Sequence, residues 1–467
     1  MVFSSLTFLF MFLPAALLVY FIVPKRWKNL VLFLSGVIFY AYGEPVYLYI
    51  MILSVLIDFC CGYVMNRCDD KPKIRFAMLM TSVVMNLTLL GVFKYSSFFV
   101  SSINGLFGTS ITDPRLPLPI GISFYTFQSM SYTIDLYRRK IPVQRNFLKF
   151  GAYVTMFPQL VAGPIVRYDD VRKELEHREV SVSIAGEGAA IFIRGLAKKT
   201  LLANNIGGLW ATIKALPIDQ LDTATAWMGI LAFTFQIFFD FSGYSDMAIG
   251  MGKMMGFQFP ENFNFPYMSK SISEFWRRWH MTLGTWFREY VYIPLGGNRK
   301  GLFKTIRNIA IVWALTGLWH GASWNFVLWG VYFGVLIILE RLFLGKLLEK
   351  LPEFLSGLYT FLMVVFSWVL FEFEQIQDIL RYFKAMFGGN GLGFMDERAF
   401  YYLRNYAVVF LLCILFSTDW CKRLVSWFTS RVPGAAVVFP LGRIALFAIC
   451  ISFLVDATYN PFLYFRF

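Results

Sequence analysis

The fold class follows from apolar runs such as Ala226-Trp-Met-Gly-Ile-Leu-Ala-Phe-Thr-Phe-Gln-Ile-Phe-Phe-Asp-Phe-Ser-Gly-Tyr-Ser-Asp-Met-Ala-Ile-Gly250. This run is long enough for an α-helix to cross a bilayer, which takes about 20 mostly apolar residues. Similar runs recur along the whole chain of 467 residues, which is 57% hydrophobic and only 15% charged. Soluble domains are about 25% charged. The composition therefore excludes a secreted enzyme, a soluble multidomain protein and a nucleic-acid-binding module, and it predicts an all-α polytopic membrane protein.

The lengths of the apolar runs predict about 11 or 12 transmembrane helices. The candidate spans are 5–23, 29–43, 46–66, 76–100, 118–137, 186–207, 226–250, 306–320, 324–344, 355–373, 403–418 and 440–459. We expect a single membrane domain over 1–467, made of N-terminal helices (1–137), a core that carries the chemistry (138–345) and C-terminal helices with an aromatic tail (346–467). None of the six cysteines forms a CxxC pair or lies near a histidine cluster, so we expect no metal site.

The net charge of +14 is typical of basic cytoplasmic loops between membrane helices. Residues 1–23 are apolar and are followed directly by the basic segment 25–28. A signal peptide has the opposite order of charges, so we expect a first transmembrane helix with its N-terminus outside. The basic segment 422–431 precedes the last apolar span, which predicts that the C-terminal tail also lies outside.

Two stretches interrupt the pattern of membrane helices. In Met156-Phe-Pro-Gln-Leu-Val-Ala-Gly-Pro164, two prolines and a glycine break an apolar run. Irregular backbone at membrane depth survives only when it is buried in protein or lines a cavity, so we expect a re-entrant segment near 156–165. The stretch 253–307 contains nine lysines and arginines against three glutamates, together with many aromatic residues. This composition predicts amphipathic helices at the cytoplasmic interface.

Two of the three histidines are candidates for chemistry. His177 lies in a charged segment, where we expect a solvated loop. His320 ends the run Trp313-Ala-Leu-Thr-Gly-Leu-Trp-His320, and on a helix Trp313, Gly317, His320 and Trp324 would share one face. An ionisable side chain in a membrane helix faces the bundle interior or a water-filled cavity. A catalytic His320 and a histidine that is only hydrogen-bonded within the bundle are equal alternatives on this evidence.

The third histidine, His280, lies in Ser273-Glu-Phe-Trp-Arg-Arg-Trp-His-Met281. On a helix it would share a face with Trp276 and Trp279. An aromatic and basic helix at the lipid headgroups is the favoured interpretation of these residues alone.

Two carboxylates lie near the end of the apolar run 226–250. Asp240 is four residues before Tyr244, and Asp246 follows closely. Carboxylates at this depth need partners. They could orient a histidine, bind a hydroxyl substrate or pair with an arginine of 277–307. For each carboxylate, the favoured interpretation is a structural ion pair or a role in supporting a residue that contacts substrate.

A buried histidine with polar neighbours suits general-base activation of a hydroxyl group. The hydroxyl could attack an acyl thioester such as acyl-CoA, which brings its own leaving group and requires neither a metal nor a bound cofactor. The phosphates of acyl-CoA would be attracted by the basic stretch 253–307. The candidate donor-binding residues in that stretch are Arg277, Arg278, Arg288 and Arg299.

Six ordered motifs resemble those of bacterial membrane-bound O-acyltransferases, in the branch that acetylates envelope polymers such as alginate. They are Pro158-Gln-Leu-Val-Ala-Gly-Pro-Ile-Val-Arg167, Phe239-Asp-Phe-Ser-Gly-Tyr-Ser-Asp-Met-Ala248, Phe257-Gln-Phe-Pro-Glu-Asn-Phe-Asn264, Glu274-Phe-Trp-Arg-Arg-Trp-His280, Tyr292-Ile-Pro-Leu-Gly-Gly-Asn-Arg299 and Leu315-Thr-Gly-Leu-Trp-His-Gly-Ala-Ser-Trp324. The resemblance covers the whole chain. It implies a helical bundle around a central funnel in the bacterial plasma (inner) membrane.

The resemblance also implies roles for single residues. His320 matches the principal catalytic histidine of the family and His280 matches the second one. The residues expected to support them or to orient substrate are Asp240, Tyr244, Asp246, Trp324 and Asn325. The donor would enter from the cytoplasm, and the expected partners are membrane lipid and an extracytoplasmic SGNH-type acyltransferase or esterase.

The C-terminal sequence Asn460-Pro-Phe-Leu-Tyr-Phe-Arg-Phe467 resembles the C-terminal hexapeptide of a small membrane partner in teichoic-acid D-alanylation. The resemblance implies that Tyr464 accepts the acyl group and relays it. An aromatic anchor at the outer interface is the alternative.

The expected function is the transfer of acetyl groups from acetyl-CoA for O-acetylation of a cell-surface polysaccharide or peptidoglycan. One alternative is D-alanyl transfer from an acyl carrier protein to teichoic acid. The other is a transporter or acyl flippase without transfer chemistry, because broken helices and buried histidines also occur in transporters.

Overall fold

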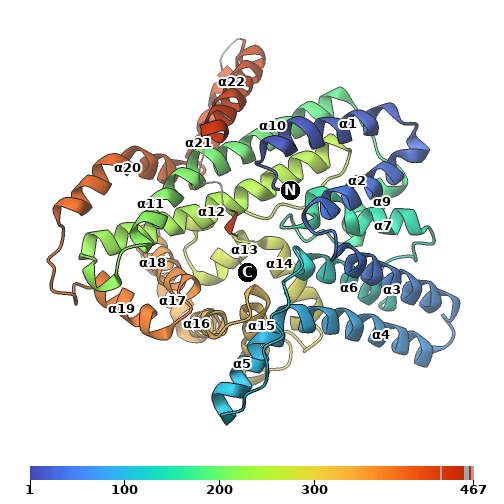
Figure 1. Ribbon diagram of the computed structural model, residues 1–467, viewed down its shortest axis with the longest axis horizontal. Helices are drawn as coiled ribbons and strands as arrows, with labels where there is room; N and C mark the ends of the chain where they lie inside the picture. Colours follow the sequence, from blue (N-terminus) through green and yellow to red (C-terminus); the bar gives the residue numbers. More distant parts are fainter. Residues whose placement is uncertain (432–433, 457–461, 464–467) are drawn as a thin grey trace. The chain divides into compact units, whose positions relative to one another are not determined.

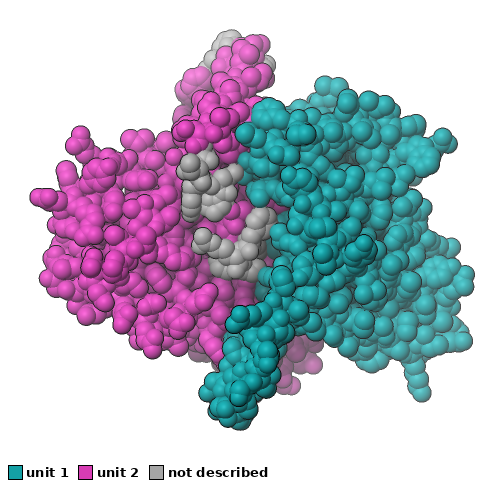
Figure 2. Space-filling view, in the orientation of Figure 1, with its two compact units in different colours: residues 1–192, 245–261 teal, residues 193–244, 262–467 magenta. Residues whose placement is uncertain are grey.

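The computed structural model describes residues 1–431, 434–456 and 462–463, and the elements formed by these residues are all helices (Figure 1). The chain divides into two compact units (Figure 2). The first unit comprises Met1–Phe192 and Ser245–Glu261, and the second comprises Ile193–Tyr244 and Asn262–Phe467. The helical class expected from the composition is therefore confirmed.

The first unit is built from nine complete α-helices among its described residues. These are α1 (Leu13–Ile22), α2 (Lys28–Gly43), α3 (Leu48–Arg67), α4 (Pro72–Leu90), α5 (Ser96–Phe107), α6 (Ile122–Tyr137), α7 (Phe147–Thr155), α8 (Phe157–Leu160) and α9 (Tyr168–Glu176). Helices α3, α4 and α6 pack around the buried carboxylate of Asp58. The Asn86 amide donates to both of its oxygens at 2.9 Å, and the hydroxyls of Ser82 and Ser129 donate as well. These neutral donors provide the partners that a buried carboxylate requires.

The backbone between α7 and α9 is irregular where the prolines predicted it. Only the four-residue α8 interrupts the stretch, and every residue from 156 to 166 is buried. Gly163 fits against the preceding turn because it has no Cβ, which would lie 2.7 Å from the Cα of Gln159. The irregular segment is thus buried in protein, while its re-entrant placement in a membrane stays a prediction.

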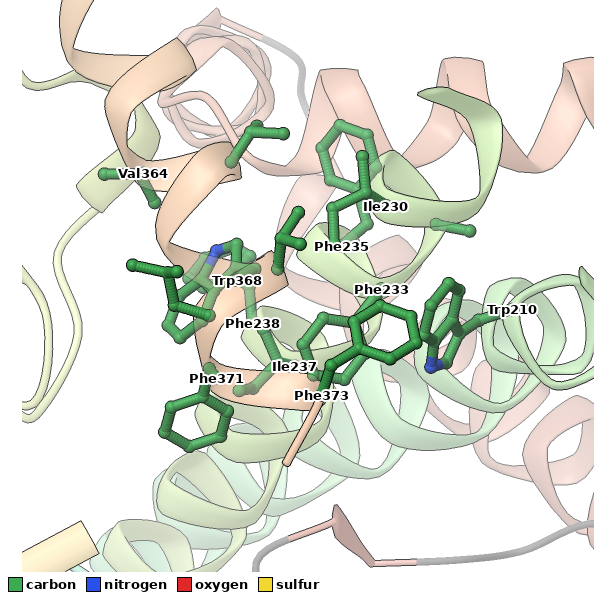
Figure 3. Packing of buried hydrophobic residues seen from close by; sticks show 14 of the residues in the cluster. Trp210, Ile230, Phe233, Phe235, Ile237, Phe238, Val364, Trp368, Phe371 and Phe373 are labelled. Carbon is green, nitrogen blue, oxygen red and sulfur yellow. The ribbon is translucent and has the colours of Figure 1, made fainter. Parts of the chain in front are cut away.

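The second unit contains His280 and His320, whereas residues 138–192 and 245–261 of the expected core 138–345 belong to the first unit. Its helices are α11 (Asn204–Lys214), α13 (Ile272–Arg278), α14 (Met281–Phe287), α15 (Leu302–His320), α16 (Trp324–Leu339), α17 (Gly345–Leu348), α18 (Glu353–Glu372), α19 (Ile376–Met386), α20 (Glu397–Phe416), α21 (Trp420–Arg431) and α22 (Ala435–Asp456). The helices α10 (Val182–Ala197) and α12 (Thr223–Met254) each contribute to both units. Aromatic residues of α12 and α18 dominate the buried cluster in Figure 3, where Phe233 packs edge-on against Trp368.

Helices α15 and α16 lie against each other through two glycines. A Cβ at Gly317 would lie 2.4 Å from the carbonyl oxygen of Phe326, and a Cβ at Gly330 would lie 2.4 Å from that of Trp313. No other residue type permits this approach. The close contact places the C-terminal end of α15, where His320 lies, against α16.

Seven helices in the described part of the chain are long and apolar enough to cross a membrane. They are Leu48–Arg67, Pro72–Phe107, Thr223–Met254, Trp324–Leu348, Glu353–Glu372, Glu397–Phe416 and Val437–Asp456, and Phe8–Ile22 is a shorter apolar helix. The other expected spans are not among these seven: 306–320 lies in the continuous 19-residue α15, and the rest are short or interrupted. Residues 29–43 and 118–137 contain helices of 16 residues, and 186–207 crosses from α10 through a π-helical segment into α11.

Candidate active site

His320 is the last residue of α15 and is only 5% exposed. The Trp329 ring of α16 lies edge-on to its imidazole, with ring centroids 4.8 Å apart, and Phe371 of α18 lies at 5.8 Å. The helix ends here because Gly321 is extended. Three helices therefore enclose the imidazole in aromatic walls that exclude water.

The structure corrects one expectation about the neighbours of His320. Trp324 does not continue the helical face of Trp313 and Gly317, because it begins α16 and is 58% exposed. Asn325, by contrast, is buried, and its amide donates to the carbonyl oxygens of Leu370 and Phe371 at 3.3 and 3.0 Å. Asn325 thereby ties the connection after His320 to the end of α18.

His280 lies between α13 and α14 and is 1% exposed. Its backbone is left-handed, with φ of 46°. Its Nδ1 lies 3.1 Å from Oδ1 of Asn262, which also accepts hydrogen bonds from the backbone N–H of Thr282 at 3.2 Å and from its hydroxyl at 2.9 Å. A backbone N–H can only donate, so the shared Asn262 atom is the carbonyl oxygen. His280 therefore carries its proton on Nδ1, and Nε2 is the nitrogen that can accept.

Burial lowers the pKa of His280 from its ordinary value of 6.5 to about 3. Desolvation disfavours the charged imidazolium. The ring is therefore neutral at physiological pH, with Nε2 as its basic atom.

The expectation that His280 continues the helix of Trp276 and Trp279 is wrong. Helix α13 ends at Arg278, and Trp279 is extended because it pairs with Phe263 in an isolated antiparallel bridge. Asn262, which directly precedes the paired Phe263, orients the ring of His280 through its side-chain oxygen. The sequence alone did not identify Asn262 as a functional residue. The available signal was its place inside the motif 257–264.

Trp319 brings the two histidines together. Its ring centroid lies 5.8 Å from that of His280 and 5.1 Å from that of His320. Phe241 of α12 packs edge-on against His280 at 4.8 Å. The two histidines, 40 positions apart in the chain, thus share one aromatic neighbour in the second unit.

A cavity of about 850 Å³ opens beside His280. Its wall includes Arg277 and Arg288 as well as Thr316, which lies one turn before His320. Of the other arginines expected to bind the donor, Arg278 pairs with Glu274 at 2.7 Å, and Arg299 is exposed away from the cavity. The structure therefore brings two of the four expected arginines to the cavity beside His280.

Glu340 fixes the start of α13. Its carboxylate accepts hydrogen bonds from the backbone N–H groups of Ile272 and Ser273 at 2.6 and 2.9 Å and from the Ser273 hydroxyl at 2.7 Å. These bonds satisfy N–H groups that lack partners within the helix. The orientation of α13, which carries Arg277 and leads to His280, depends on this carboxylate.

Asp240 forms a buried ion pair, as its apolar setting predicted. Its partner is Lys199, at 2.6 Å, rather than an arginine of 277–307. Tyr244, one turn later on α12, stacks on Phe462 with ring centroids 4.5 Å apart. Asp246 is half-buried in the part of α12 that belongs to the first unit.

The expectations for Tyr464 and His177 remain. Tyr464 lies outside the described residues. His177 is exposed just after α9, which confirms the expectation of a solvated loop residue.

Residues 122–371 match the family model of membrane-bound O-acyltransferases. A Pseudomonas aeruginosa protein named probable alginate O-acetylase is 42% identical over 391 residues, which are 83% of this chain and 75% of the relative. The Helicobacter pylori peptidoglycan O-acetyltransferase is 33% identical over 427 residues, covering 84% of this chain and 81% of the relative. The Bacillus subtilis teichoic acid D-alanyltransferase is 29% identical over 276 residues, covering 54% of this chain and 68% of the relative.

Proposed function

Because this chain belongs to the membrane-bound O-acyltransferase family, we propose that it is an O-acetyltransferase of the bacterial plasma membrane. Its donor is acetyl-CoA, and its product is an O-acetylated cell-surface polysaccharide or peptidoglycan. The names of the Pseudomonas aeruginosa and Helicobacter pylori relatives support acetyl transfer to polymers of the cell envelope. The observation that carries the chemical part of the proposal is the contact of both histidines with Trp319 beside a cavity with arginines on its wall.

The charges on the cavity wall support acetyl-CoA as the donor. Acetyl-CoA carries several phosphate charges, and the exposed guanidinium groups of Arg277 and Arg288 on the wall complement them. Both charges lie on the elements that flank His280, so a donor held by them would have its thioester near that histidine.

The transfer needs one base and one leaving group. An acceptor hydroxyl attacks the thioester carbonyl carbon, so a C–O bond forms and the C–S bond breaks. His320 takes the hydroxyl proton and returns it to the departing thiolate of CoA. The neutral His280 contributes Nε2 as a hydrogen-bond acceptor at the cavity wall. The aromatic enclosure of His320 excludes water, which would otherwise hydrolyse the thioester.

We propose Tyr464 as the first acceptor. A phenol has an ordinary pKa near 10, below that of a sugar hydroxyl, so a histidine can deprotonate it more easily. The acyl-tyrosine would then pass its acetyl group to an extracytoplasmic SGNH-type partner. This route requires the C-terminal tail to lie outside and the chain to be embedded in membrane lipid, and we propose that the N-terminus lies outside as well.

The proposal is tested with radiolabelled acetyl-CoA added to the purified protein in lipid vesicles, with and without the partner. We expect label on the C-terminal peptide without the partner and on the polymer with it. His320→Ala abolishes both signals, and Tyr464→Phe abolishes the peptide signal. Unlabelled peptide in active wild-type protein, together with a fully active Tyr464→Phe variant, contradicts the relay.

The teichoic acid D-alanyltransferase relative keeps one alternative open. D-alanyl transfer from an acyl carrier protein predicts labelling from the charged carrier and none from acetyl-CoA. A transporter or flippase without transfer chemistry predicts that His320→Ala leaves acylation of the polymer intact.

A further inference from the structure

Leu463, near the C-terminal end of the chain, is bound by a charged pair deep in the second unit. The backbone N–H of Leu463 donates to Oδ2 of Asp240 at 2.8 Å, while Oδ1 of Asp240 lies 2.6 Å from Nζ of Lys199. Phe462 and Leu463 are both buried, which shows that these two residues sit in protein. Burying an isolated charge costs free energy. The carboxylate of Asp240 offsets this cost by pairing with the Lys199 ammonium group and accepting a hydrogen bond from the Leu463 backbone.

The local backbone permits this contact. Lys199 lies in the π-helical segment Lys198–Ala203, and such segments concentrate at functional sites. Across from it, Gly243 of α12 allows close approach, since a Cβ there would lie 2.7 Å from the carbonyl oxygen of Gly195. The buried ammonium group of Lys199 can therefore reach Asp240 in the middle of an apolar helix.

A second contact fixes the direction of the segment. Phe462 stacks on Tyr244 with an angle of 27° between the rings. Asp240 and Tyr244 are one helical turn apart, so they lie on the same face of α12. Phe462 therefore contacts Tyr244 through its side chain, and Leu463 contacts Asp240, one turn earlier on the same helix, through its backbone.

We propose that Asp240 is a positioning residue that holds Phe462 and Leu463 in a single register against α12, and that the ion pair with Lys199 fixes the orientation of its carboxylate for this purpose. The contact to Leu463 is made by the backbone, so it specifies where the segment lies and not which side chain position 463 carries. This inference rests on the proposed function, because Tyr464 directly follows the anchored residue in the sequence.

The anchor is tested by removing the backbone N–H of Leu463, which donates to Asp240. Leu463→Pro deletes the backbone donor to Asp240, whereas Leu463→Met keeps both this donor and a side chain of similar volume. The wild-type protein and both variants, in lipid vesicles, are treated with a carboxypeptidase, and the remaining C-terminal peptide is followed by mass spectrometry. We expect Leu463→Pro to speed trimming about 10- to 100-fold, in line with the loss of a hydrogen bond to a charged group. Leu463 is buried, and Leu463→Met should stay within about threefold of the wild type, because it retains the backbone donor and most of the apolar contact.

A second pair of variants tests the anchor from the other side. Asp240→Leu combined with Lys199→Met removes both charges without stranding either one, and it should speed trimming as much as Leu463→Pro. The matched control is Glu372→Leu combined with Lys214→Met, which removes another ion pair of the same unit and should leave trimming unchanged.

The outcomes separate the anchor from the relay. Wild-type trimming rates in both Leu463→Pro and the Asp240/Lys199 variant overturn the anchor. Fast trimming with undiminished acetylation supports the anchor and overturns the Tyr464 relay. Fast trimming with a matching loss of acetylation, and normal acetylation in Leu463→Met, supports both.

Discussion

The hydrogen bond from His280 to Asn262 leads to a quantitative prediction. Asn262→Ala removes the oxygen that accepts from Nδ1 of His280 and from both donors of Thr282. A buried donor left without an acceptor costs about 1–3 kcal/mol. If the cost to His280 falls on the transition state, kcat decreases by a factor of about 5 to 150, since each 1.36 kcal/mol corresponds to a factor of ten. The KM for acetyl-CoA should change little, because Asn262 lies outside the residues that form the cavity wall.

The assay is the initial rate of acetyl transfer from labelled acetyl-CoA by protein in vesicles. Thr282→Val is the matched control, because it removes a hydroxyl bound to the same Asn262 oxygen and leaves the bond of His280 in place. We expect its kcat to remain within about threefold of the wild type, as expected for one neutral hydrogen bond.

A further variant separates tautomer control from folding. Asn262→Asp keeps an acceptor beside Nδ1 but adds a negative charge, which raises the pKa of His280. Nitrogen NMR of labelled histidine should show Nδ1–H neutral imidazole in the wild type and a protonated fraction in Asn262→Asp as the pH is lowered. Equal losses of kcat in Thr282→Val and Asn262→Ala, or an Nε2–H tautomer in the wild type, would refute the reasoning.

Three more predictions follow from the described contacts. Arg288→Ala should raise the KM for acetyl-CoA by roughly 3- to 30-fold with a smaller change in kcat, as for the loss of one charge-assisted phosphate contact, while Lys304→Ala outside the cavity changes neither value. Gly317→Ala should lower the thermal unfolding temperature, because its Cβ would lie 2.4 Å from a backbone oxygen; Gly105→Ala, which has open space around it, should leave that temperature unchanged or raise it. The native state holds His280 neutral, with a pKa of about 3 against 6.5 in the unfolded chain. As the pH falls below about 6.5, the unfolded state takes up the proton first, and the free energy of unfolding decreases by about 1.4 kcal/mol per pH unit. Thermal unfolding between pH 4 and 7 should therefore depend less on pH in His280→Gln than in the wild type, and an identical dependence would contradict the buried neutral ring.

The composition and the lengths of the apolar runs were enough to predict a helical membrane protein, because a bilayer imposes length and hydrophobicity on each segment separately. The prolines of 156–165 likewise predicted irregular backbone, since the loss of a backbone donor is a local property. The sequence also placed His320 at the end of the apolar span 306–320 within an aromatic run, although it wrongly continued the helical face to Trp324. These features depend on residues that are neighbours in the chain.

The tertiary structure decided which side chains meet. Helical periodicity predicted that His280 lies on the same helix face as Trp276. In the structure, pairing with residues 262–264 ends the helix at Arg278, and the imidazole of His280 faces Asn262 instead. Asp240 required a partner by its burial, but Lys199 became that partner only because Gly243 lets two helical segments approach. Contacts between residues 18 to 223 positions apart depend on how helices pack, and packing is set by the shapes of many side chains at once rather than by any local pattern.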